Sequence, residues 1–124
     1  LIRKFHEAAE NNSPEVVVWG DGTPMREFLY ADDLANALVY LMLNYDSREF
    51  VNVGYGNEIT IKDLALLIKK IIGFEGHLEF DTSKPNGTPR KLMDIAKIKG
   101  FGWSPSITLD AGIKRTVLEV YNQF

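Results

Sequence analysis

The chain has 124 residues, of which 45% are hydrophobic and 25% charged, the composition of a single globular domain rather than of a disordered segment. A formal net charge of −3 gives no indication of nucleic-acid binding, and the absence of cysteine excludes disulfides, zinc–thiolate sites and thiol catalysis. No apolar run approaches the roughly 20 residues that a membrane-spanning helix needs. We therefore expect a cytoplasmic domain with no nucleic-acid or membrane partner.

The first ten residues, LIRKFHEAAE, predict a helix that is already under way where the chain starts. Ile2, Phe5 and Ala9 share one helical face, and neither a methionine nor a capping residue precedes them. We therefore expect residues 1–124 to form one domain of a longer protein.

The next elements predict short strands alternating with helices. The run VVVW at 16–19 is typical of a buried strand, and FVNVGYG at 50–56 predicts a second short strand. Between these strands, Asp32 or Asp33 can cap a helix. Its apolar positions recur at helical spacing and comprise Leu34, Leu38, Leu41 and Met42.

The clearest helix signal lies at 60–73. Thr60 and Asp63 have the spacing of a capping box, apolar residues follow at helical intervals, and Gly73 ends the pattern. The remaining expected elements are a strand, a polar loop, a short helical stretch and a last helix, at 77–81, 82–91, 94–99 and from about Thr108. The sequence therefore predicts an α/β fold without internal repeats.

Signals for catalysis, metal or cofactor binding are absent from this sequence. The Gly-x-Gly pairs at 20–22, 54–56 and 100–102 lack the third glycine of a dinucleotide fingerprint and are typical of turns. No tyrosine is followed four positions later by a lysine, so one helix turn cannot supply a Tyr–Lys proton-transfer pair. His6 and His77 are too far apart in the sequence to indicate a metal site. We expect no catalytic, cofactor-binding or metal-binding residue here.

Basic residues gather in one loop of this acidic chain. The segment 82–91 contains Lys84, Arg90 and Lys91, together with an Asn-Gly pair and two prolines that limit the conformations of the loop. Such a loop can present several donors to one phosphate. The alternative is a solvated basic loop without a ligand.

A second cation, Arg26, follows a strand and a turn of similar character. Its planar guanidinium suits phosphate oxygens, although an ion pair with Glu27 or with a helix-capping aspartate is the alternative. Trp19, at the end of the strand, either stacks on a base or sugar or belongs to the core. These residues predict an anion site around Arg26 and the basic loop.

Four stretches carry a resemblance to a known family: VVVWGDGTPMREFLYADD, VNVGYGNEITIKDLA, FDTSKPNGTPRKLMD and GWSPSITLDAGI. In this order they resemble the C-terminal part of GDP-L-fucose synthases, which are NADPH-dependent epimerase-reductases acting on GDP-4-keto-6-deoxy-D-mannose. The resemblance implies the small substrate-binding lobe of an extended short-chain dehydrogenase. It also implies that NADP(H) and the catalytic Ser, Tyr and Lys belong to an N-terminal Rossmann domain absent here, that this lobe alone is inactive, and that the intact enzyme is a homodimer.

The resemblance further implies which residues contact the GDP-sugar. Arg26 matches an arginine that contacts the nucleotide-sugar, Trp19 a tryptophan at the same site, and Lys91 a lysine that contacts phosphate. Lys4 stands where the family often has arginine, and Asn86 stands where aspartate is common. Two alternatives stay open: the substrate lobe of another sugar-nucleotide epimerase or dehydratase, and a non-catalytic interaction module.

Overall fold

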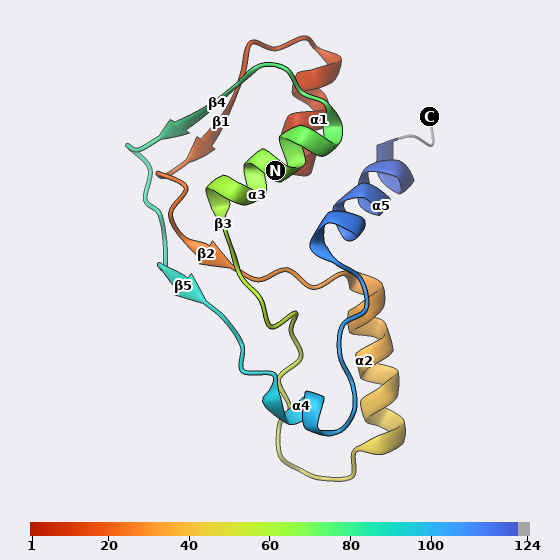
Figure 1. Cartoon of the computed structure of the whole chain (residues 1–124). Helices are drawn as coiled ribbons and strands as arrows, with labels where there is room; N and C mark the ends of the chain where they lie inside the picture. The colour runs from red at the N-terminus through yellow and green to blue at the C-terminus, as the bar shows by residue number, and fades with distance from the viewer. Residues whose placement is uncertain (122–124) are drawn as a thin grey trace.

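Two short sheets and five helices make up the part of the chain that the computed structural model describes, residues 1–121 (Figure 1). The helices are α1 (Ile2–Glu10), α2 (Ala31–Asn44), α3 (Ile61–Ile72), α4 (Ala96–Gly100) and α5 (Leu109–Tyr121). The strands are β1 (Glu15–Trp19), β2 (Met25–Arg26), β3 (Ile59–Thr60), β4 (His77–Asp81) and β5 (Arg90–Lys91). The predicted α/β fold class is confirmed.

The two sheets differ in size and direction. β1 and β4 form a parallel pair in which Trp19 lies opposite Asp81, and Val16 and Val18 of β1 are buried. The second sheet has the order β3-β2-β5, with β2 antiparallel to β3 and parallel to β5. In Figure 1 this second sheet lies between the β1–β4 pair at one end and α2 and α4 at the other.

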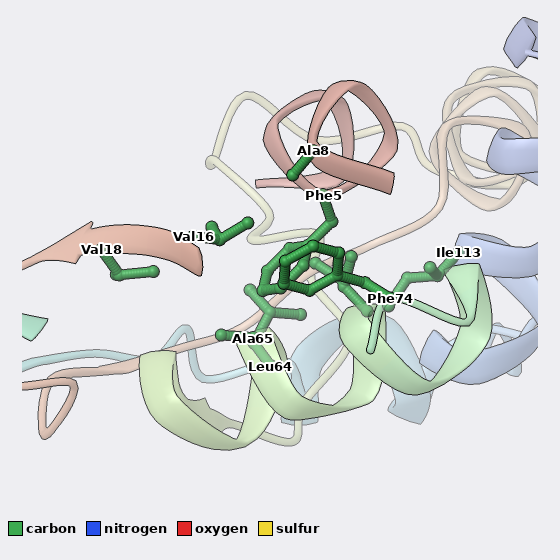
Figure 2. Close-up of a cluster of buried hydrophobic side chains, with 9 residues drawn as sticks. Phe5, Ala8, Val16, Val18, Leu64, Ala65, Phe74 and Ile113 are labelled. Carbon is green, nitrogen blue, oxygen red and sulfur yellow. The ribbon is translucent and has the colours of Figure 1, made fainter. Parts of the chain in front are cut away.

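The first of two hydrophobic clusters lies between α1, α3 and the β1–β4 pair (Figure 2). Phe5 is fully buried, and its ring meets the ring of Phe74 edge-on with 5.7 Å between the centroids. The buried members of the cluster are Phe5, Ala8, Val16, Val18, Leu64, Ala65, Ile68, Phe74 and Ile113.

Helix α3 confirms the predicted cap and stop. The backbone N–H of Asp63 donates to Thr60 Oγ1 at 3.0 Å, and the Thr60 hydroxyl donates to the Asp63 carboxylate at 2.7 Å. Gly73 ends the helix in the left-handed conformation with φ of +77°, which glycine adopts without strain.

The second hydrophobic cluster packs α2 against α4 and the segment that follows α4. Its buried residues are Ala37, Ile95, Ile98 and Trp103, and Leu29, Tyr40, Leu41, Val51 and Val53 pack around them. The indole N–H of Trp103 donates to Asn36 Oδ1 at 2.9 Å, so the polar atom of this buried ring is satisfied.

The predicted cap of α2 is wrong. The helix begins at Ala31 after Tyr30, which makes no side-chain capping bond, so Asp33 already lies inside the first turn. Its buried carboxylate instead accepts hydrogen bonds from Ser106 N at 3.0 Å, Ser106 Oγ at 2.8 Å and Ile107 N at 2.8 Å. The helix therefore turns Asp33 and Ala37 inward, whereas three of the predicted apolar positions, Leu34, Leu38 and Met42, are exposed.

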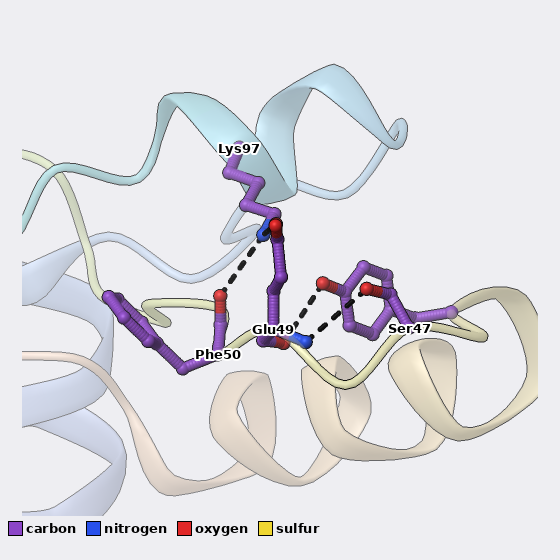
Figure 3. Close-up of polar contacts among 5 residues, drawn as sticks. Ser47, Glu49, Phe50 and Lys97 are labelled. Carbon is purple, nitrogen blue, oxygen red and sulfur yellow. Dashed lines mark hydrogen bonds and ion pairs between the residues drawn. The ribbon is translucent and has the colours of Figure 1, made fainter.

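The strand predicted at 50–56 is also wrong, because this segment has no neighbouring strand among the described residues. Val51 and Val53 pack against the second cluster, as β-branched residues of a strand would. The connector before it is held by side chains (Figure 3): Lys97 Nζ donates to Glu49 at 2.9 Å and to the Phe50 carbonyl at 3.2 Å, and Glu49 N donates to Ser47 Oγ at 3.3 Å.

Asp33 generates a stability prediction. Burial would raise the pKa of Asp33, but hydrogen bonds from Ile107 and Ser106, with the charge of Arg115, outweigh burial and leave the pKa below its usual value. We expect Asp33→Asn to lower the free energy of unfolding at pH 7 by about 1–3 kcal/mol, because the amide cannot accept all three bonds. Urea unfolding of both proteins measures this difference.

The pH dependence has a defined sign. Because the folded-state pKa of Asp33 is lowered, its stabilising contribution is present above the unfolded pKa of about 3.9 and is lost as the pH falls through the folded value. The difference between wild type and Asp33→Asn should therefore shrink between pH 5 and the acid limit of the folded state. Asp110→Asn, which breaks only an exposed pair with Lys114, serves as the control and should change little. A difference that is constant with pH contradicts the assignment.

Candidate anion-binding site

Two cations from distant parts of the sequence lie side by side on the second sheet. Arg26 is on the central strand β2, and its register partner on β5 is Lys91. Paired residues on adjacent strands point to the same face, about 5 Å apart along the sheet. Among residues 1–121 neither cation takes part in an ion pair. Like charges in this position repel one another, so this face is suited to an anion.

The half-buried Arg26 is held by backbone atoms. Its Nη1 donates to the Met25 carbonyl at 2.7 Å, and Nη2 lies 3.7 Å from the position that a Cβ on Gly87 would take. The alternative ion pair with Glu27 does not form, because the Glu27 carboxylate accepts hydrogen bonds from backbone amides elsewhere. The guanidinium therefore keeps donors for a ligand.

The loop between β4 and β5 closes over the turn that follows β1. Asn86 Oδ1 accepts a hydrogen bond from Asp21 N at 2.8 Å, which fastens the loop to that turn. Gly20 has φ of +83°, and a Cβ there would collide with the Asn86 side chain. Asn86 therefore positions the loop, and its side-chain oxygen is already used by the protein.

Trp19 is not part of the core. It occupies an outward position on β1, alternating with the buried Val18, and it is 66% exposed. Lys84 Nζ lies 5.5 Å from the centroid of its ring, within the range of a cation–π contact. The open indole face beside the loop can stack on a flat ring of a ligand.

Lys4 is separate from this group. It lies on α1, and its Nζ donates to the Val17 carbonyl at 3.1 Å. That bond satisfies a carbonyl of β1 and ties α1 to the strand. No described contact links Lys4 to Arg26 or to the loop.

The three cations of the basic loop divide between two roles. Arg90 makes a two-point contact with Glu58, with Nε to Oε2 at 2.8 Å and Nη2 to Oε1 at 2.6 Å, and this hydrogen-bonded pairing raises the pKa of Arg90. Successive strand residues point to opposite faces, so Arg90 and Lys91 face away from each other. Lys84 and Lys91 remain for a ligand, and Arg90 supports the sheet.

Sequence patterns did not reveal that Glu27 helps to hold this geometry. The Glu27 carboxylate accepts hydrogen bonds from Tyr55 N and Gly56 N, both at 3.0 Å, and from Met93 N at 2.8 Å. The only sequence signal was the Gly54-x-Gly56 pair, because Gly54 leaves room for the carboxylate and the N–H of Gly56 donates to it. Its amide partners are too distant in the chain for spacing to reveal them.

The arrangement offers cations and an aromatic ring and is suited to binding. Among the described residues there is no cluster of three or more His, Asp or Glu side chains placed to hold a metal ion. Nor does this part of the chain contain a helix with the length and apolar character required to cross a membrane. Arg26 and Lys91 can hold an anion, and the exposed ring of Trp19 on the other sheet can stack on a flat ring.

Comparisons with known proteins agree with the fold and the resemblance. Residues 1–54 match the NAD dependent epimerase/dehydratase family. The chain is 53% identical over 116 residues to GDP-L-fucose synthase 1 of Arabidopsis thaliana, covering 94% of this chain and 36% of that protein. It is 46% identical over 125 residues to GDP-L-fucose synthase of Escherichia coli (strain K12), covering 94% of this chain and 39% of that protein.

A solved structure gives the same result. The structure of a GDP-L-fucose synthetase from Naegleria fowleri bound to NADP matches with a TM-score of 0.88 at 32% identity, covering 98% of this chain and 40% of that one. The chain thus spans well under half the length of these relatives. The resemblance seen in the sequence is confirmed: over nearly its whole length the chain is similar to GDP-L-fucose synthases, and it corresponds to one part of such a protein.

Proposed function

We propose that residues 1–124 are the GDP-sugar-binding lobe of an NADPH-dependent epimerase-reductase that converts GDP-4-keto-6-deoxy-D-mannose to GDP-L-fucose. The observation that carries this proposal is the pair of like charges, Arg26 and Lys91, on one face of the sheet. A nucleotide diphosphate supplies the negative charge that offsets their repulsion. The exposed Trp19 at the end of β1 suits the base or the sugar next to that diphosphate.

The work of this lobe is positioning. Arg26 binds phosphate oxygens through a planar fork, which fixes direction, whereas Lys91 acts as a point charge at the edge of the sheet. Holding the diphosphate this way sets where C3, C4 and C5 of the sugar lie relative to acid–base groups on the rest of the protein. Asn86 contributes by fastening the loop, and Lys4 by fastening α1 to β1.

The glycine pairs of this chain do not fit a dinucleotide cofactor. Gly20 is packed on Asn86, and the Gly56 amide is taken by Glu27. None of the three pairs, at 20–22, 54–56 and 100–102, opens a helix after a strand, as a phosphate-binding turn must. We therefore place NADP(H) on the remainder of a cytoplasmic, homodimeric enzyme, and this lobe takes no part in hydride transfer.

Replacing Arg26 tests the proposed grip. We expect Arg26→Ala to weaken the binding of GDP to this chain by about 1–3 kcal/mol, the scale of hydrogen bonds to a charged group. Calorimetric titration with GDP measures the loss. Arg3→Ala is the control, because it removes an exposed arginine on α1 that pairs only with Glu7 among the described residues, and it should change GDP affinity much less. Equal losses of GDP affinity in the two variants would indicate an effect of net charge alone and would contradict the proposal that Arg26 binds the diphosphate.

The choice of base separates this proposal from its alternatives. In NMR titrations of the isotope-labelled chain, we expect GDP to shift the Trp19 indole and the amides near Arg26 and Lys91 at lower concentration than UDP. A preference for UDP indicates another sugar-nucleotide epimerase or dehydratase. If neither nucleotide shifts any signal of the folded chain or of the full-length protein, the result indicates a non-catalytic module.

The division of labour makes a further prediction. The chain alone should not oxidise NADPH with any sugar nucleotide, because we propose that the catalytic acid–base groups and the dinucleotide site belong to the remainder of the protein. The decrease in NADPH absorbance reports this directly. Turnover by the purified chain would contradict the proposal that catalysis belongs to the remainder of the protein.

A further inference from the structure

Glu27 links the central strand of the site to both of its neighbours. It follows Arg26 directly, and its carboxylate lies between two segments that flank β2. On one side Oε1 accepts from Met93 N at 2.8 Å, two residues after Lys91 of β5. On the other side Oε2 accepts from the amides of Tyr55 and Gly56, both at 3.0 Å, in the segment that leads to β3.

The segment 54–56 is shaped to receive this carboxylate. A Cβ on the buried Gly54 would lie 2.8 Å from Glu27 Oε2, closer than real Cβ atoms come, so a larger residue there would push the carboxylate aside. Gly56 has φ of +81°, a left-handed conformation that glycine adopts without strain, and its N–H and that of Tyr55 both donate to the same carboxylate oxygen. Two glycines and one carboxylate therefore form a single fitted contact.

The sheet needs such a contact because its ladders are short. β2 pairs with β5 through two residues, and with β3 through two residues. A slip of one residue between β2 and β5 would place Lys91 on the opposite face from Arg26 and bring Arg90 into its place. Ladders this short specify their register weakly, whereas the three bonds of Glu27 act on both neighbours at once.

We propose that Glu27 is the positioning residue of the anion site: by binding the amides of Met93, Tyr55 and Gly56, it fixes the register of β3-β2-β5 and holds Arg26 and Lys91 on one face. Glu27 itself does not touch the ligand. The inference relies on the proposed function only for the choice of GDP as the probe.

The test uses Glu27→Gln, which keeps the size of the side chain and removes one acceptor. We expect the backbone nuclear Overhauser contacts between Arg26 and Lys91 to weaken, and the affinity for GDP to fall by roughly tenfold or more, the scale for losing hydrogen bonds to a carboxylate. Asp33→Asn is the matched control, since that carboxylate also accepts three hydrogen bonds but lies on α2 and binds Ser106 and Ile107. It should lower stability and leave both the Arg26–Lys91 contacts and GDP affinity unchanged.

A second variant keeps the test decisive if Glu27→Gln does not fold. Gly54→Ala leaves Glu27 intact but fills the space beside its carboxylate, so it should reproduce both losses. Unchanged Arg26–Lys91 contacts in the folded Glu27 or Gly54 variants would overturn the positioning role. The positioning role would also be overturned if, in every variant including Asp33→Asn, the loss of GDP affinity were proportional to the loss of stability. If the wild-type protein does not bind GDP, the proposed function fails. The backbone nuclear Overhauser contacts between Arg26 and Lys91 then still decide the role of Glu27.

Discussion

Backbone amides that have no strand beside them need another acceptor, and in this chain carboxylates supply it. Glu27 accepts from three amides, and Asp33 accepts from two amides and a hydroxyl. Each carboxylate joins segments that are far apart in the sequence, and each lies where the strands are too short or absent to do so. An unsatisfied buried amide costs free energy comparable to a lost hydrogen bond, so these two side chains decide which loops can close.

This constraint produces the site through the alternation of strand residues. Once β2 and β5 are in register, Arg26 and Lys91 share one face, and Arg90 is turned to the other face. There Arg90 finds Glu58 and becomes part of the support of the sheet. Arg90 and Lys91 are adjacent in the sequence. The strand register decides that Lys91 lies beside Arg26 and that Arg90 pairs with Glu58 on the other face.

Elements whose signals are local could be predicted from the sequence. The α3 helix, from its Thr60 cap to Gly73, depends on neighbours within a few residues, and its predicted position is confirmed. The strand predicted at 77–81 is also confirmed, and it has a partner in β1. The segment 50–56 has the residues of a strand, but a strand also needs a partner, which a single sequence does not reveal. For the same reason the pairing of Arg26 with Lys91 and the role of Glu27 could not be derived, because their contacts join distant parts of the chain.

The pairing of like charges connects the fold to the proposed function. Folding alone gives no reason to place Lys91 opposite Arg26, since cations in paired positions destabilise a sheet by a few tenths of a kcal/mol to about 1 kcal/mol. A neighbouring acid would remove that cost, yet the adjacent Glu27 is engaged by amides and Glu58 by Arg90. The two acids that could neutralise the pair are therefore held away from it by specific bonds. Such an arrangement leaves two cations on one face without an ion pair among residues 1–121, and an anionic ligand is the partner that we propose for them.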